Sequence, residues 1–186
     1  MRKISSFNFT SINGFFKGPN GDISWHKHGP QENEYGKEGA QSGNILLFGR
    51  VTYEMMAAFW PTPNAAKMFP EMAAAMNSAE KMVFSNTLKK ADWANTSIVK
   101  GNIFDEMRKL KQTPGRDMTI LGSGSIVTQF AENGLIDEFQ FMIDPVALGN
   151  GTPLFSNMQQ QLNLELVNSR IFKSGVVLLC YKPTSS

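Results

Sequence analysis

The sequence has a single cysteine, only two histidines and almost no net charge. Cys180 has no second cysteine for an internal disulfide, and its place in the apolar run 176–180 favours a small buried hydrophobic side chain. A net charge of +2 leaves no electrostatic footprint for nucleic acid or for an anionic membrane. His26 and His28 have no accompanying cysteine or carboxylate pattern, so we expect no metal site.

Long hydrophobic runs are also missing. No segment approaches the roughly 20 apolar residues that span a bilayer, and the first residues lack the apolar core of a signal peptide. We therefore expect a cytoplasmic protein with no membrane partner. The balance of 41% hydrophobic and 18% charged residues in a chain of 186 residues predicts one globular domain over 1–186.

The central stretch of the sequence is 45–56, where a strand pattern changes to a helix pattern across one glycine. The residues 45–48 are all apolar, Gly49 follows, and a helical pattern then runs to Pro61. The first N–H groups of a helix have no intrahelical acceptor and carry partial positive charge, so this turn suits a phosphate. Arg50 adds a positive fork, although an ordinary turn with a solvated arginine explains this stretch equally well when it is taken alone.

The segment 118–127 repeats this arrangement with two glycines. A strand runs into Gly122-Ser123-Gly124-Ser125-Ile126, and a helix follows that ends near 133–134. Glycines let the phosphates of a ligand approach the backbone closely. The spacing falls short of G-x-G-x-x-G, and no acidic residue is placed on a following strand for a ribose, so a Rossmann dinucleotide unit is disfavoured.

Alternating strand and helix patterns fill the first two thirds of the chain, and strands dominate the rest. A turn-rich loop at 11–25 keeps Phe15, Phe16 and Trp25, which indicates a packed functional loop. The expected strands are 2–10, 45–48, 80–88, 96–100, 118–121, 136–145, 162–172 and 175–182, and the expected helices are 31–42, 50–60, 64–78, 104–111 and 125–133. This order predicts an α/β fold with one mixed, mainly parallel sheet, helices on both faces and a C-terminal antiparallel strand pair.

In their order and spacing these segments resemble the dihydrofolate reductase-like superfamily. The closest resemblance is to its branch related to the C-terminal reductase domain of the bifunctional riboflavin-biosynthesis deaminase-reductase. The segments that carry it are 11–15, 21–25, 48–54, 84–88, 121–125, 134–139 and 145–155. The resemblance implies a stand-alone reductase that passes a hydride from NADPH to a pterin-like or riboflavin-pathway pyrimidine-like heterocycle, such as 5-amino-6-(5-phosphoribosylamino)uracil.

The resemblance also implies roles for particular residues. The pyrophosphate of NADPH would lie between two sets of residues, and the adenosine 2′-phosphate would be held by Arg50, Ser85 and Asn86, for which an arginine fork is well suited. The first set is Gly49, Arg50, Val51 and Thr52, and the second is Gly122, Ser123, Gly124, Ser125 and Ile126. The nicotinamide would lie under the loop 11–25. The resemblance further implies that two copies can form a homodimer through the sheet.

The catalytic residues are less clear, because the sequence departs from the family here. Asn13 stands where the riboflavin branch commonly has an aspartate, and either water or Asn13 would relay the proton. Folate-reducing members carry an acidic residue in the region that here holds Glu32, Glu34 and Glu38, none of which matches uniquely, and Glu34 is the catalytic candidate. No arginine matches the one that grips the folate tail. True dihydrofolate reductase activity and a nucleotide-binding protein without turnover are the two alternatives.

Overall fold

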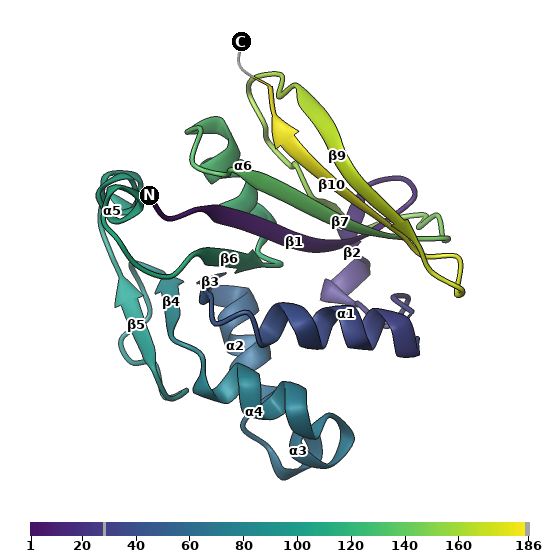
Figure 1. The fold of residues 1–186 in the computed structure, drawn as a ribbon, viewed down its shortest axis with the longest axis horizontal. Helices are drawn as coiled ribbons and strands as arrows, with labels where there is room; N and C mark the ends of the chain where they lie inside the picture. The colour runs from purple at the N-terminus through teal and green to yellow at the C-terminus, as the bar shows by residue number, and fades with distance from the viewer. Residues whose placement is uncertain (28, 185–186) are drawn as a thin grey trace.

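The computed structural model describes residues 1–27 and 29–184, which form one eight-stranded sheet flanked by helices (Figure 1). The strand order is β5-β4-β3-β6-β1-β7-β10-β9, and β2 pairs separately with β8. The strands are β1 Ile4–Ser11, β2 Phe15–Lys17, β3 Ile45–Gly49, β4 Lys81–Phe84, β5 Thr96–Val99, β6 Met118–Leu121, β7 Glu138–Asp144, β8 Thr152–Pro153, β9 Leu164–Ile171 and β10 Val177–Pro183. The helices are α1 Pro30–Ala40, α2 Arg50–Phe59, α3 Pro63–Met68, α4 Pro70–Ser78, α5 Ile103–Gln112 and α6 Gly124–Glu132, with a 3₁₀ turn at Pro19–Gly21.

The pairing confirms the predicted mixed sheet. In the order of the sheet, the neighbouring strands β5, β4, β3, β6, β1 and β7 pair in parallel. Strand β10 is antiparallel to β7, and β9 is antiparallel to β10. Strand β3 lies inside the parallel part, and its residues from Ile45 to Phe48 are buried on both faces. A continuous apolar run is what a parallel strand covered on both faces requires.

Helices cover both faces of the sheet, as predicted. Alternate side chains of β3 belong to two separate hydrophobic clusters because successive residues of a strand point to opposite faces. Leu47 shares one cluster with Phe130 of α6, and Phe48 shares the other with Tyr53 of α2 and Met76 of α4. Figure 1 shows α1, α2 and α4 on the side opposite α6.

The single helix predicted over 64–78 is wrong, because the segment forms two helices. α3 ends at Met68 and α4 begins at Pro70, with Phe69 between them at φ −139° and ψ 65°. Proline has no N–H to continue the helix, and its ring disfavours helical backbone in the preceding residue. The methionines of this segment are correspondingly mixed in burial: Met76 is buried, whereas Met68 is exposed.

Within the described residues, no helix is both long enough and apolar enough to cross a bilayer.

Candidate functional site

The two glycine turns lie side by side in the structure. They follow β3 and β6, which are neighbouring parallel strands, so both turns emerge at the same edge of the sheet. The backbone N–H of Gly49 donates to Ser123 Oγ at 2.8 Å. A Cβ added to Gly122 would lie 3.3 Å from Thr52 Cγ2, and one added to Gly49 would lie 3.2 Å from Ile126 Cγ1. The close approach of the turns therefore depends on glycine at both positions.

Each turn leads directly into a helix that no side chain caps. The residue before α2 is Gly49 and the residue before α6 is Ser123, and neither gives its helix a side-chain hydrogen bond. Ser123 adopts left-handed backbone at φ 57°, and its hydroxyl is the acceptor for Gly49 rather than a cap for α6. The N–H of Ile126 donates to the Ser123 carbonyl at 2.8 Å, and no side chain at the cap position satisfies the N–H groups at the start of either helix. Both helix dipoles favour an anion there.

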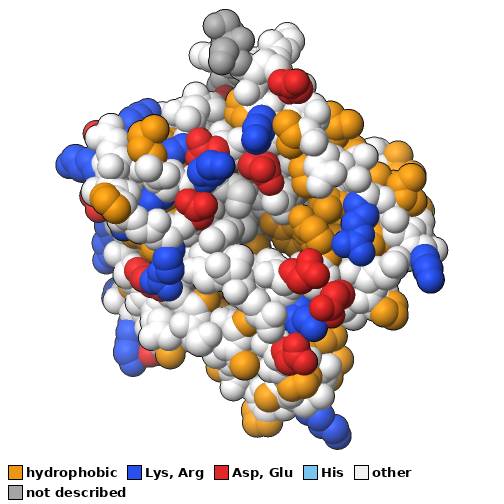
Figure 2. Space-filling model, in the orientation of Figure 1, with side chains coloured by type: hydrophobic (Ala, Val, Ile, Leu, Met, Phe, Trp, Pro, Cys, Tyr) orange, Lys and Arg blue, Asp and Glu red, His pale blue; other side chains and the backbone are white. Residues whose placement is uncertain are grey.

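These helix ends open into a cavity of about 1400 Å³ that extends along the sheet above α1. Figure 2 shows a hollow between the sheet and α1 with hydrophobic side chains gathered beside it. Every residue predicted to bind the cofactor lines this cavity, and their roles toward a cofactor stay predictions. They are Gly49, Arg50, Val51, Thr52, Ser85, Asn86, Gly122, Ser123, Gly124, Ser125 and Ile126.

Three of these residues lie at the β4 end of the cavity. Arg50, the first residue of α2, is half-exposed and its Nη1 donates to both carboxylate oxygens of Glu54, at 2.9 and 3.1 Å. Ser85 Oγ accepts from the N–H of Leu88 at 3.0 Å, and Asn86 Oδ1 accepts from the N–H of Gly101 at 3.0 Å. The two polar side chains therefore shape the loops around Arg50, and the guanidinium is held only by an exposed i,i+4 pair, a weak interaction.

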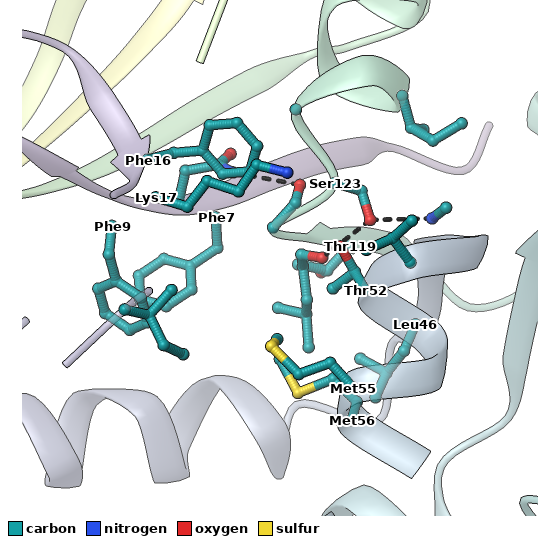
Figure 3. A pocket seen from close by; sticks show the side chains of 18 of the residues that line it. Phe7, Phe9, Phe16, Lys17, Leu46, Thr52, Met55, Met56, Thr119 and Ser123 are labelled. Atoms are coloured by element: carbon teal, nitrogen blue, oxygen red, sulfur yellow. Dashed lines mark hydrogen bonds between the residues drawn. The ribbon is translucent and has the colours of Figure 1, made fainter. Parts of the chain in front are cut away.

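Lys17 is a cavity residue that the sequence reasoning missed. It ends β2, which pairs with β8, and Figure 3 shows its side chain extending toward Ser123. Its neighbour Phe16 packs against the second turn so closely that a Cβ on Gly124 would lie 2.7 Å from the ring. A lone lysine in a turn-rich loop carries no motif, so only the fold could reveal that its side chain extends toward the start of α6, with its ammonium 5.3 Å from the ring centroid of Phe16.

The loop 11–27 is anchored to β7 by a buried contact between an imidazole and a carboxylate. His26 Nδ1 lies 2.5 Å from Asp144 Oδ2, the N–H of Lys27 donates to Asp144 Oδ1 at 2.7 Å, and the imidazole stacks on Phe9 with ring centroids 3.6 Å apart. His26 thus fixes the loop at the cavity wall. His28, the other histidine considered for a metal, lies outside the described residues. Elsewhere in the part of the chain that the structure describes, no three His, Cys, Asp or Glu residues are grouped to hold a metal ion.

The structure does not bring the two catalytic candidates to the cavity. Asn13 is exposed; its Oδ1 accepts from Ser11 Oγ at 2.8 Å and its Nδ2 donates to the Leu148 carbonyl at 2.8 Å, so its amide joins two loops. Glu34 lies on the outer face of α1 and pairs with Lys37 at 2.8 Å, which raises the pKa of that lysine. Two residues along a helix is a rotation of about 200°. Glu32, not Glu34, therefore faces inward.

Glu32 is a buried carboxylate in the cavity lining, 5% exposed, and accepts a hydrogen bond from Ser174 Oγ in the hairpin between β9 and β10. Tyr35, one helical turn further on, also lines the cavity and donates to Gln140 Oε1 at 3.0 Å. Burial raises the pKa of Tyr35 to about 12. This phenol thus stays a hydrogen-bond donor at neutral pH.

Hydrophobic side chains form most of the wall between α1, α2 and the sheet. Figure 3 shows Phe7 and Phe9 of β1 facing the cavity from one side and Met55 and Met56 of α2 from the other. Trp60 also lines it. An apolar wall with a few convergent polar groups is the usual character of a small-molecule site.

Comparison with known proteins agrees with this arrangement. The family model described as the RibD C-terminal domain matches residues 2–178. A Bacillus subtilis (strain 168) relative, the uncharacterized protein YyaP, is 35% identical over 172 residues, which cover 92% of this chain and 89% of YyaP.

Two solved structures share the fold at low sequence identity. A putative riboflavin biosynthesis protein from Shewanella sp. PV-4 superposes with a TM-score of 0.79 at 23% identity, covering 98% of this chain and 99% of that one. Dihydrofolate reductase from Enterococcus faecalis superposes with a TM-score of 0.65 at 18% identity, covering 98% and 97%. The dihydrofolate reductase-like fold is thus confirmed, and the chain belongs to the family of RibD C-terminal domains.

Proposed function

We propose that this protein is an NADPH-dependent reductase that transfers a hydride to a small heterocyclic molecule. The observation that carries the proposal is the meeting of two uncapped helix N-termini at one cavity, with Arg50 at the start of one helix. Two such termini together favour a ligand with more than one phosphate group. The proposal is also supported by the family of RibD C-terminal domains to which the chain belongs, and by the likeness of its fold to a dihydrofolate reductase.

The order of the strands gives the direction in which the cofactor would lie. The cavity passes the ends of β4, β3, β6 and β1 in turn. Arg50, with Ser85 and Asn86, would hold the 2′-phosphate at the β4 end, since an arginine fork matches a phosphate group. The pyrophosphate would lie at the two turns, and the nicotinamide would reach β1 under the loop that carries Phe16 and Lys17.

The chemistry of the proposed reaction comes from the cofactor, which supplies the hydride. The protein would orient the ring and exclude water. Lys17 would place its charge over the pyrophosphate from the loop side, opposite the N–H groups of α2. The anchored loop and the apolar wall would keep solvent from the transfer. Asn13 has no part in this proposal, because its amide is used in joining 11–14 to 146–148.

Consumption of NADPH tests the proposal. The purified protein is mixed with NADPH and a panel of dihydropterins and pyrimidines, and the loss of NADPH absorbance is followed. Turnover of at least one heterocycle that falls when Arg50 is replaced by glutamine is the expected result. Tight NADPH binding with no turnover of any member would instead support the non-catalytic nucleotide-binding alternative.

Dihydrofolate reductase activity is the second candidate, and the position of Glu32 favours it. A buried carboxylate at the cavity wall is the kind of group that binds and protonates a heterocycle. Glu32→Gln should then abolish reduction of dihydrofolate while leaving NADPH binding intact. Glu34→Gln is the matched control, because Glu34 lies on the opposite face of the same helix. Equal effects of the two substitutions would contradict this candidate.

A further inference from the structure

The positive charges of the cavity are gathered at its cofactor end. Among the described residues that line it, only Lys17 and Arg50 are lysine or arginine. Arg50 begins α2, and Lys17 extends toward Ser123 at the start of α6 (Figure 3). Both cations therefore lie near the helix N-termini, and the phosphate groups of a bound dinucleotide would neutralise their charges.

The remainder of the cavity is apolar and adaptable. Its walls come from β1, from the loop before α1, and from α2 to α4, and the side chains are aromatic rings and methionines. They include Phe7, Phe9, Trp25, Met55, Trp60 and Met72. Aromatic rings stack on flat rings, and methionine adjusts to irregular shapes. A planar heterocycle fits such a wall.

The charges nearest this apolar part are negative or paired with a carboxylate, apart from Arg170, whose charge acts on Tyr35 of the lining. Glu32 and Glu38 line it, and Figure 2 shows acidic side chains over α1 below the hollow. Lys37, between α1 and α4, is held by Glu34 at 2.8 Å and by Glu71 at 3.2 Å. The guanidinium of Arg170 lies 4.9 Å from the ring centroid of Phe172, outside the lining. An anionic group entering here would meet carboxylates and no unpaired lysine or arginine of the lining.

We infer that the substrate is a flat, uncharged heterocycle that carries neither a phosphate nor a carboxylate tail. This inference rests on the proposed function and narrows its substrate class. A phosphate buried without a cation loses hydration that nothing replaces, and the lining carboxylates would repel it. The protein should therefore reject a 5-phosphoribosyl pyrimidine and the glutamate tail of dihydrofolate, although it would accept the corresponding uncharged rings. The inference thus opposes dihydrofolate reductase activity, the second candidate function.

Matched ligand pairs test the inference on the protein saturated with NADP⁺. One pair is 5-amino-6-ribosylaminouracil and its 5′-phosphate, and the other is a 6-methyl dihydropterin and dihydrofolate. Binding is followed through the fluorescence of Trp25 and Trp60, which line the cavity. We expect at least one uncharged member to bind about tenfold or more tightly than its anionic partner, a difference of about 1.4 kcal/mol, with an affinity that salt hardly changes.

An engineered charge sharpens the test. Met55 lies in the apolar wall and is 42% exposed, so a lysine there can keep its ammonium in water. Met55→Lys should raise the affinity for the phosphorylated pyrimidine, whereas the control Met55→Gln should not. Arg170→Gln should leave the affinity for the anionic ligands as low as before.

The outcomes separate the inference from the function on which it rests. Failure of NADP⁺ itself to bind would overturn the proposed function. If NADP⁺ binds and the anionic member of either pair binds as tightly as the uncharged one, or if no uncharged member binds, the inference is wrong and the cofactor site stands. Loss of anionic ligand binding in Arg170→Gln would likewise contradict the inference, because it would identify a phosphate or carboxylate partner at the cavity rim.

Discussion

Alanine at Gly122 should remove cofactor binding with only a modest loss of stability. Gly122 has φ +59°, a left-handed conformation that an L side chain adopts at a cost of about 1–2 kcal/mol. Its added Cβ would point into the gap between the turns, 3.3 Å from Thr52 Cγ2. The proposed pyrophosphate site occupies this gap. The substitution would therefore combine backbone strain with a blocked binding site.

The other end of the same helix supplies a matched control. Gly134, just past α6, has φ +63°, and a Cβ there would meet no atom within 4 Å. Gly134→Ala should carry the same backbone strain without touching the cavity. For a chain of this length, about 1–2 kcal/mol corresponds to a Tm lower by about 2–8 °C. We expect this shift for both variants in thermal denaturation, and loss of NADPH binding in fluorescence titration only for Gly122→Ala.

Two results would refute this reasoning. If Gly122→Ala binds NADPH as the unmodified protein does, the gap between the turns does not hold the pyrophosphate. If Gly134→Ala loses binding to the same degree, the loss comes from strain transmitted through α6 and not from the blocked gap.

Four further substitutions test single charges. Arg50→Gln should weaken NADPH binding by about tenfold or more and leave NADH binding nearly unchanged, because a charge-assisted hydrogen bond contributes about 1.5–3 kcal/mol; Glu54→Gln, which frees the guanidinium, should strengthen NADPH binding about twofold in the same titration, and weaker binding would contradict this. Lys17→Gln should weaken the binding of NADPH and of NADH to the same extent and should reduce the salt dependence of both affinities. Weaker binding of NADPH alone would place Lys17 at the 2′-phosphate instead. Burial lowers the pKa of Lys81 to about 8, whereas lysine in an unfolded chain has a pKa near 10.4. Between these two pH values the unfolded chain binds more protons than the folded protein. The free energy of unfolding should therefore rise as the pH increases from about 8 to about 10.4. Lys81→Met should show no such rise in urea denaturation, and a rise equal to that of the unmodified protein would contradict the assignment.

The spacing of apolar residues predicted most of the fold, because the local sequence of each helix or strand reflects which of its faces are buried. The wholly apolar run of β3 marks a strand covered on both faces, and the helical spacing after Gly49 marks α2. Pro70 marks the break between α3 and α4 in the sequence, whereas the helical spacing of apolar residues over 64–78 predicts one continuous helix. The short pairing of β2 with β8 joins residues far apart in sequence. No local pattern predicts such a pairing.

The site was predictable to the extent that glycines mark it. Gly49 and Gly122 indicate turns, and the two turns lie side by side because β3 and β6 are neighbouring parallel strands. The roles of polar side chains were harder, because a side chain's direction depends on helix phase and on partners distant in sequence. Glu34 and Glu32 differ only in phase on α1, and Asn13 is taken up by Leu148, which is 135 residues away. Lys17 belongs to no motif, and only the folded loop places it beside α6.

The most direct test of the account is a titration of the unmodified protein with NADPH and, separately, with NADH, followed by tryptophan fluorescence. The two uncapped helix termini and Arg50 predict saturable binding of both dinucleotides, with NADPH bound about tenfold or more tightly because only it carries the 2′-phosphate. Binding of neither nucleotide would contradict the account. The fold and the family would stand, and the cavity would need a different ligand.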